Sequence, residues 1–160
     1  MIGTTSSADK AKIAHANGCD AVILYTIQDF PLEVMSITKG RGADLILDAV
    51  GKPTIPLDLK CANKRGTIVF YGMAGGRPDP IDPYYLYFYR SLRFCGGDCF
   101  NYLETPQEVQ MRIEAVFEGY RKGFLRSDIS DIVPLEQASA LHAKIESRAT
   151  SGKFLLRVAS

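Results

Sequence analysis

The feature that most constrains the fold of this chain is an alternation of short apolar runs with longer amphipathic stretches. Val-, Ile- and Leu-rich runs at residues 21–25, 43–50 and 67–71 are bounded by Gly or Asp, and segments with helical periodicity separate them. Parallel strands need such crossover helices, whereas antiparallel hairpins do not. The pattern therefore predicts an α/β fold built on a parallel sheet.

Capping residues and turn residues indicate where the other elements begin. Candidate N-caps precede three helices, and these are Ser6 or Ser7, Asp29 and Thr105. Further helices are predicted at residues 53–61, 83–89 and 135–148, and further strands at residues 2–4, 91–95, 129–133 and 153–158.

Two segments are so apolar that they predict extensive burial. The run 43–50 lacks a regular polar alternation, which is typical of a strand buried on both faces. The helix that carries Tyr84 to Tyr89 is apolar nearly all round, so it is expected to be covered on more than one side.

Composition and charge exclude several classes of protein. A chain of 160 residues with 46% hydrophobic and 23% charged side chains can bury its own core. Its 19 Lys and Arg against 18 Asp and Glu give a net charge of +1, too small to favour nucleic acid or a membrane surface as the main partner. No apolar run approaches the roughly 18 residues of a membrane span, and the N-terminus lacks the pattern of a signal peptide. A cytoplasmic location is expected.

The cysteines and histidines do not predict a metal or nucleophilic site. Cys95 and Cys99 are closely spaced, but a zinc site needs four ligands in short paired spacings. No second pair comes from the remaining candidates, which are Cys19, Cys61, His15 and His142. We therefore expect reduced thiols, no metal site and no catalytic side chain.

The residues that follow the strands are the candidates for a binding site, because ligands of doubly wound sheets lie at the carboxyl ends of the strands. Hydroxyl residues and Lys10 follow the first strand, which suits a 2′-phosphate of NADP better than the 2′-hydroxyl of NAD, normally bound by Asp or Glu. An equally open interpretation is that Ser6 and Ser7 are caps and that Lys10 is a solvated surface charge.

Three more strand ends carry weaker signals. Tyr25 follows the second strand, Asp48-Ala49-Val50-Gly51 ends the third, and the Gly-rich segment 71–76 follows the fourth. The small residues would let a cofactor approach the backbone, and the amides of the Gly-rich segment could face a nicotinamide or pyrophosphate. Neither G-x-G-x-x-G nor a phosphate-binding P-loop occurs in the sequence, so motifs alone establish no nucleotide site.

Together, these segments resemble one family in order and in spacing. The segments that carry the resemblance are Ile-Gly-Thr-Thr at 2–5, Gly-Cys-Asp at 18–20, Gly-Arg-Gly-Ala-Asp at 40–44, Leu-Asp-Ala-Val-Gly-Lys at 47–52, Lys-Arg-Gly at 64–66 and Glu-Ser-Arg-Ala-Thr at 146–150. They resemble the C-terminal half of quinone oxidoreductases related to zeta-crystallin. These enzymes are zinc-free members of the medium-chain dehydrogenase/reductase superfamily.

The resemblance implies an NADPH-dependent reductase that passes hydride to a quinone or a similar electron-poor acceptor. It implies a Rossmann-like NADP-binding part at residues 1–122, without the first strand and Gly-rich turn of the family, and a segment at 123–160 that returns to a catalytic domain. The cofactor contacts it implies are Ser6 and Lys10 at the 2′-phosphate, Tyr25 at the adenosine end, Ala49 and Val50 on the wall beside the cofactor, Tyr71 and Gly72 near the nicotinamide half, and Arg148 and Lys153 facing the phosphates.

In the family's strand order of 3-2-1-4-5-6, the first strand is central. The edges of the strands at Ile2 and Thr67 are therefore expected to face an empty slot, and the chain is expected to be a fragment that is inactive alone. The resemblance also implies a homodimer through the edge at Tyr84 to Cys95. The alternatives are an NADPH-dependent enoyl or alkenal reductase fragment and a non-catalytic nucleotide-binding or dimerisation module; RNA binding is not expected at this charge.

Overall fold

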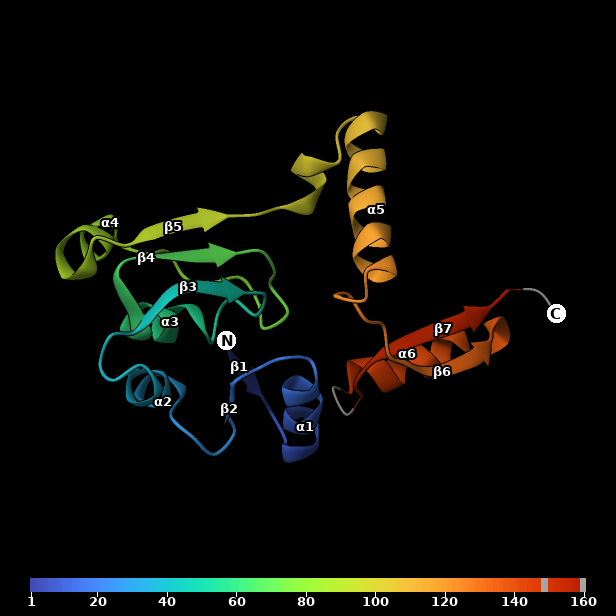
Figure 1. Ribbon diagram of the computed structural model, residues 1–160, viewed down its shortest axis with the longest axis horizontal. Coiled ribbons are helices and arrows are strands. Elements are labelled where there is room, and N and C mark those ends of the chain that lie inside the picture. Colours follow the sequence, from blue (N-terminus) through green and yellow to red (C-terminus); the bar gives the residue numbers. More distant parts are fainter. Residues whose placement is uncertain (148–149, 159–160) are drawn as a thin grey trace. The chain divides into compact units, whose positions relative to one another are not determined.

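The computed structural model describes residues 1–147 and 150–158, and all strand pairs found there are parallel. A helix lies in the connection between the paired strands (Figure 1), as parallel pairing requires. The contacts divide the chain into two units, Met1–Tyr102 and Leu103–Ser160. The α/β class predicted from the alternation is confirmed.

The first unit holds two parallel sheets. Strand β4 lies between β3 and β5 in one sheet, and β1 pairs with β2 in the other. The elements are β1 (Ile2–Thr5), α1 (Ala8–Ala16), β2 (Ala21–Leu24), α2 (Phe30–Ile37), β3 (Ala43–Asp48), α3 (Ile55–Cys61), β4 (Ala62–Phe70), α4 (Pro83–Tyr85), the π-helical turn η1 (Leu86–Arg90), β5 (Arg93–Gly96) and the 3-10 turn η2 (Cys99–Tyr102).

The second unit consists of a long helix followed by a β-α-β segment. Its elements are α5 (Pro106–Arg121), β6 (Ile129–Pro134), the 3-10 turn η3 (Leu135–Gln137), α6 (Ala138–Glu146) and β7 (Lys153–Arg157). Strand β6 pairs with β7. The resemblance divides the chain after residue 122, into a cofactor-binding part and a segment that returns to the catalytic domain. The contacts within the structure divide it after Tyr102, which is a different criterion, so the division after residue 122 stays a prediction.

The three predicted N-caps are confirmed by hydrogen bonds. Ser7 Oγ accepts from the amide of Lys10 at 3.4 Å, and Asp29 Oδ1 accepts from the amide of Leu32 at 3.0 Å. Thr105 Oγ1 accepts from the amide of Glu108, whose carboxylate in turn accepts from the amide of Thr105. These bonds satisfy amides that a helix leaves without partners at its first turn.

Two clusters of buried side chains hold the first unit together. Ile23, Phe30, Val34 and Cys61 join β2, α2 and α3, and Ile55, Ala62, Ile68 and Leu92 join α3 and β4 to the segment before β5. Ile46 of β3 packs against both clusters. The two sheets of this unit therefore share apolar packing, although no hydrogen-bonded ladder joins them in the described part of the chain.

The prediction that the strand at 43–50 is buried on both faces is wrong. Leu45 and Leu47 are 57% and 63% exposed, whereas Ile46 between them faces the clusters described above. Strand β3 pairs with β4 alone, and its face that carries Leu45 and Leu47 is more than half exposed. Because successive side chains of a strand point to opposite faces, one face of β3 can be covered while the other is exposed.

The prediction that the Thr67 strand borders an open slot is also wrong. Thr67 of β4 is in register with Leu45 on one side and with Arg93 on the other, so both edges of β4 are paired. Among the described residues of the first unit, open edges belong to β1, β2, β3 and β5. The misassignment arose in applying the strand order: the strand expected beside the central position is β3, and β4 lies one place further out.

The aromatic helix begins at Pro83 as predicted, but it is not covered as predicted. Its first turn is α4 and the chain then continues as the π-helical turn η1. Four of its aromatic side chains are more than half exposed, and these are Tyr84, Tyr87, Phe88 and Tyr89. Leu86 packs against the second buried cluster, and the exposed aromatic rings face outward.

The helices that the structure describes include none of the length and apolarity that crossing a membrane requires.

Candidate functional site

The carboxyl ends of β1 and β2 bring three of the predicted site residues close together. The amide of Tyr25 donates to Thr5 O at 3.1 Å, and Thr26 Oγ1 donates to Ser6 O at 3.1 Å, so the two strand ends are joined side by side. Lys10 lies in the first turn of α1, one residue beyond Asp9. Ser7 rather than Ser6 is the cap of this helix, which leaves the Ser6 hydroxyl outside the capping bond.

The carboxyl ends of β3 and β4 form a second group. The amide of Tyr71 donates to Asp48 O at 2.9 Å, the amide of Ala74 to Ala49 O at 3.1 Å, and the amide of Gly75 to Val50 O at 2.7 Å. These bonds tie the Gly-rich segment 71–76 to the turn 48–51. The structure therefore brings Ala49, Val50, Tyr71 and Gly72 together in one place, as the strand-end argument predicts.

The close contact between these two segments requires glycine at position 72. A Cβ atom there would lie 2.8 Å from Ala49 O, closer than side-chain carbons approach a carbonyl oxygen. Backbone without side chains is what a flat cofactor needs in order to lie against a strand end. The close approach to Ala49 thus explains why glycine occurs at position 72, although the sequence has no G-x-G-x-x-G motif.

A buried carboxylate fixes the turn that follows β3. Oδ1 of Asp48 accepts from the amides of Val50 at 2.5 Å and Gly51 at 3.0 Å, and Oδ2 accepts from the hydroxyl of Thr54 at 2.6 Å. Asp48 is 5% exposed. Although its burial raises its pKa, the hydrogen bonds from Asp58, Thr54 and the two amides together hold that pKa below the usual value.

Asp58 on α3 is the partner that sequence reasoning missed. It is 5% exposed, and burial, reinforced by the neighbouring Asp48 carboxylate, raises its pKa to about 8. Its Oδ2 accepts no hydrogen bond from the described residues. A protonated Asp58 can donate to Asp48, so at neutral pH the pair holds one shared proton and one negative charge.

A pattern in the sequence could have revealed Asp58. It lies three residues after the buried Ile55 and three before the buried Cys61, on the inward face of α3. A carboxylate on such a face needs a partner. Asp48 is a candidate because it ends the preceding strand, and only a short connection separates that strand from α3. The role of the Asp48 and Asp58 pair is to position the turn that carries Ala49 and Val50.

The two remaining predicted site residues come from the second unit of the chain. Arg148 lies outside the described residues. Lys153 begins β7 in the second unit, where its amide donates to Asp128 O at 2.8 Å. Its role toward a cofactor in the first unit stays a prediction.

No group of three or more His, Cys, Asp and Glu residues able to hold a metal occurs in the part of the chain that the structure describes. Burial, with a contribution from Asp58, raises the pKa of the Cys61 thiol to about 12, so this cysteine is unreactive at neutral pH. What the strand ends offer is a set of hydroxyls, backbone amides, small residues and one lysine.

A comparison with protein families decides the family. Residues 1–115 match the model of the family described as zinc-binding dehydrogenase, which is well over half of the chain. The chain belongs to this family. Within it, the chain is a quinone oxidoreductase-like member of the medium-chain dehydrogenase/reductase superfamily, as the resemblance in the sequence implied.

Individual relatives agree with this assignment. The 2-haloacrylate reductase of a Burkholderia species is 34% identical over 98% of the chain and 47% of its own length. Quinone oxidoreductase 1 of Escherichia coli is 30% identical over 98% of the chain and 48% of its own length. The crystal structure of the Escherichia coli quinone oxidoreductase complexed with NADPH matches with a TM-score of 0.90 at 30% identity, over 98% of the chain and 49% of that protein.

The chain spans about half the length of the curated relatives it matches, and the matched half contains their Rossmann part. The parallel α/β fold of the chain corresponds to this domain of the superfamily.

Proposed function

We propose that the chain is the cofactor-binding half of an NADPH-dependent quinone reductase. The observation that carries the proposal is the meeting of Ser6, Lys10 and Tyr25 at one pair of strand ends and of Ala49, Val50, Tyr71 and Gly72 at another. Both lie where doubly wound folds bind dinucleotides. The similarity to a relative whose structure holds NADPH supports the same cofactor.

The residues present fit this cofactor. The Ser6 hydroxyl, the Lys10 ammonium and the amides at the start of α1 would hold the 2′-phosphate, and Tyr25 would cover the adenosine end. The turn carrying Ala49 and Val50 would form the wall beside the cofactor, with Tyr71 and Gly72 near the nicotinamide half. When bound, NADPH supplies the hydride, so the chain's own groups serve to bind and orient it.

The open edges of β1 and β3 support a further part of the proposal. A strand paired with both would complete the sheet of the superfamily, and a Gly-rich turn after it would face the pyrophosphate. We propose that a longer protein supplies these elements together with the catalytic domain. Residues 123–160 would pack with that domain, and Arg148 and Lys153 would face the phosphates of the cofactor.

A second candidate activity is reduction of an electron-poor alkene. The 2-haloacrylate reductase similar to this chain reduces, by its name, a substrate of this kind. An enoyl or alkenal reductase would use the same cofactor half. NADPH oxidation by the longer protein, measured with a quinone, with 2-chloroacrylate and with an enoyl thioester, separates these activities. No turnover by that protein with NADPH bound would favour a non-catalytic module.

Two neighbouring lysines of α1 test the cofactor site. Lys10→Ala is expected to weaken binding of NADPH to the full chain about tenfold while leaving NADH unchanged, because only NADPH carries the 2′-phosphate. Lys12→Ala is the matched control, since Lys12 lies on the same helix and pairs with Asp9 at 2.9 Å. Titration by NADPH fluorescence gives both affinities, and tighter binding of NADH than of NADPH by the wild-type chain would contradict the proposal.

Self-association would use the exposed aromatic edge. Strand β5 has an open edge among the described residues, and the aromatic helix before it is exposed. A homodimer through the segment Tyr84–Cys95 would bury the β5 edge together with the stacked rings of Tyr84 and Phe88, whose centroids are 5.3 Å apart. Phe88→Asp is expected to shift the chain toward monomer in sedimentation velocity, and an unchanged sedimentation coefficient would contradict this placement.

A further inference from the structure

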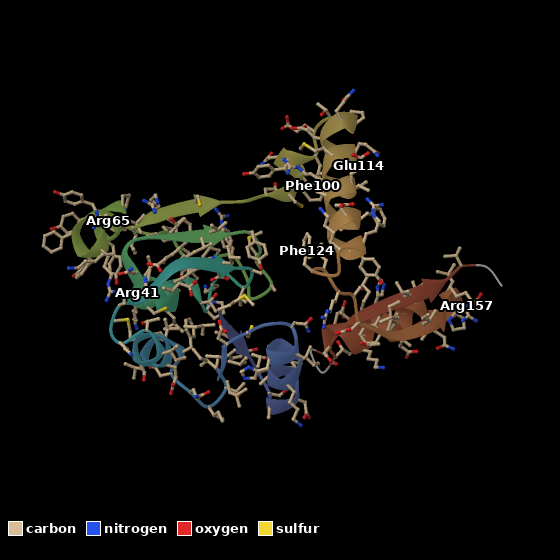
Figure 2. The ribbon with its side chains drawn as sticks, viewed as in Figure 1. Arg41, Arg65, Phe100, Glu114, Phe124 and Arg157 are labelled. Carbon is tan, nitrogen blue, oxygen red and sulfur yellow. The ribbon has the colours of Figure 1, made fainter. Side chains whose placement is uncertain are left out.

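A basic pocket lies at the amino ends of the strands, at the opposite end of the sheet from the strand ends described above. Its walls come from the turn before β3, the last turn of α3, the first residues of β4 and the π-helical turn η1. Figure 2 shows Arg41 and Arg65 at this end of the first unit. The pocket has a volume of about 680 Å³, which is the size of pockets that hold small organic ligands.

Four cations line this pocket and no carboxylate does. They are Arg41, Lys60, Lys64 and Arg90, in a chain whose total charge is only +1. Asp44 lies next to the pocket and pairs with Arg41, so one of the four charges is partly compensated. Lys60 and Lys64 form no ion pair with any described residue. Like charges gathered in a concave surface raise the local concentration of anions.

Several of these groups are held in place before any ligand arrives. The Arg90 guanidinium donates from Nη1 to Ala62 O at 2.6 Å, which fixes its plane and keeps its other N–H groups for a second partner. Asp44 orients Arg41 and also accepts from Asn63 Nδ2 at 2.6 Å. Gly42, at a φ of +84°, lets the turn before β3 approach so closely that a Cβ there would lie 2.6 Å from Cys61 O.

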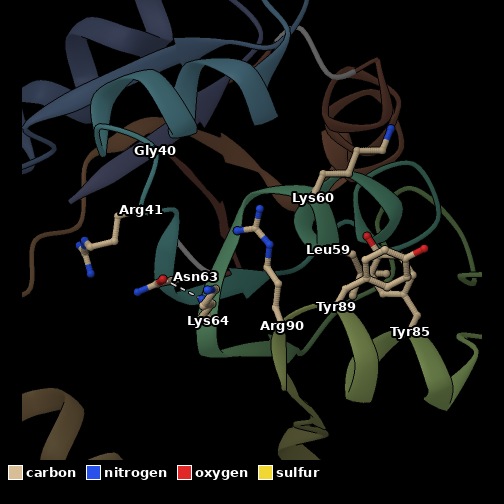
Figure 3. A pocket seen from close by; sticks show the side chains of 9 residues that line it. All are labelled: Gly40, Arg41, Leu59, Lys60, Asn63, Lys64, Tyr85, Tyr89 and Arg90. Carbon is tan, nitrogen blue, oxygen red and sulfur yellow. Dashed lines mark hydrogen bonds between the residues drawn. The ribbon is translucent and has the colours of Figure 1, made fainter.

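The other side of the pocket is aromatic. Tyr85 and Tyr89 are one helical turn apart, and their ring centroids are 4.6 Å apart at an angle of 31°. Figure 3 shows the two rings side by side, with the Arg90 guanidinium and Lys64 between them and Arg41. A π-helical turn is rare and often lies at a functional site; here η1 places Tyr89 and Arg90 on the same pocket.

We propose that this pocket binds a phosphorylated aromatic small molecule of the nucleotide class. The phosphate groups would lie against Arg90, Lys64 and Lys60, whose N–H groups make charge-assisted hydrogen bonds to phosphate oxygens. The flat ring would stack on the tyrosine pair. This site is separate from the proposed NADPH site, and it does not depend on that proposal.

The test uses ADP, inorganic pyrophosphate and adenosine as probes of the full chain. ADP is expected to bind more tightly than either of the others, because it alone carries both recognised parts. The double variant Lys60→Gln/Lys64→Gln is expected to weaken ADP binding at least tenfold in calorimetric titration. Its charge-matched control is Lys12→Gln/Lys122→Gln, two lysines that pair with Asp9 and Glu118, do not line the pocket and are expected to leave ADP affinity within twofold.

Amide chemical shifts locate the bound probe and separate the two proposed sites. Shifts at Asn63, Lys64 and Arg90 on addition of ADP support the pocket, and Tyr89→Leu is expected to weaken ADP but not pyrophosphate. Shifts confined to residues 6–10 and lost in Lys10→Ala would assign ADP to the NADPH site and overturn the pocket. No binding of ADP at millimolar concentration, or binding of a single-stranded oligonucleotide in its place, would equally overturn it.

Discussion

Strands β3 and β4 are neighbours with similarly apolar sequences, yet their surroundings differ. β4 is paired on both sides, and its Ile68 is completely buried. β3 is paired with β4 alone, and Leu47, one residue before its end, is 63% exposed. The difference shows that apolar composition specifies a strand but not its burial, which depends on the neighbours that cover it.

The largest effect is expected when the same truncation is made in both strands. Ile68→Ala leaves a cavity at a fully buried position and is expected to lower the free energy of unfolding by roughly 4 kcal/mol. Leu47→Ala removes an exposed side chain and is expected to cost less than about 1 kcal/mol. Urea denaturation of the full chain measures both.

If Ile68→Ala fails to fold, Ile68→Val replaces it, and this variant is expected to lower the free energy of unfolding by about 1 kcal/mol. Equal losses in the two strands would mean that the exposed face of β3 is buried in solution by another copy of the chain.

A smaller effect is expected from the carboxylates at the end of β3. The unfolded chain releases the proton of Asp58 near pH 4, whereas the folded chain keeps it up to about pH 8. The folded chain therefore holds an extra proton between these values, and its stability falls as the pH rises. We expect a loss on the order of 2 to 3 kcal/mol between pH 5 and pH 8.

Asp58→Asn is expected to remove this part of the pH dependence, because an amide can donate to Asp48 without titrating. Thermal unfolding at several pH values compares the two chains. Parallel curves for the wild type and the variant would contradict the shared proton. The lowered pKa of Asp48 affects stability only below about pH 4, so it does not contribute to the change between pH 5 and pH 8.

The smallest effect is expected at Gly72, where the segment that follows β4 contacts the turn that follows β3. Gly72→Ala places a Cβ against Ala49 O and is expected to cost about 1 to 2 kcal/mol and to weaken NADPH binding several-fold. Gly96→Ala, at the end of β5, is the control because no atom lies within 4 Å of its added Cβ. A Gly72→Ala chain with wild-type stability would show that the two segments separate freely.

Local signals in the sequence predicted the local structure. Ser7, Asp29 and Thr105 cap helices because each lies directly before an amphipathic stretch, and the bonds involved span only three residues. The strand-end argument also predicted the group around Ala49 and Gly72. Parallel strands place their carboxyl ends together whatever the sequence of the loops.

Long-range relationships could not be predicted in the same way. The exposure of Leu45, the central place of β4 and the outward aromatic rings all depend on which elements are neighbours in space. Asp58 was overlooked because a single carboxylate in a short helix resembles a surface residue until its face is known. The basic pocket was overlooked because its cations come from three separate segments of a nearly neutral chain.

The parallel pairing of the strands has a consequence for how quickly this chain acquires its structure. In each pair the partners are far apart in sequence, as Ile2 is from Ala21 and Thr67 from Arg93, and no hairpin is available among the described residues to nucleate a sheet. Each pairing must close a loop before its bonds form, which slows folding. Refolding after dilution from urea is therefore expected to begin with the capped helices, and the ladders of β4 are expected to form late.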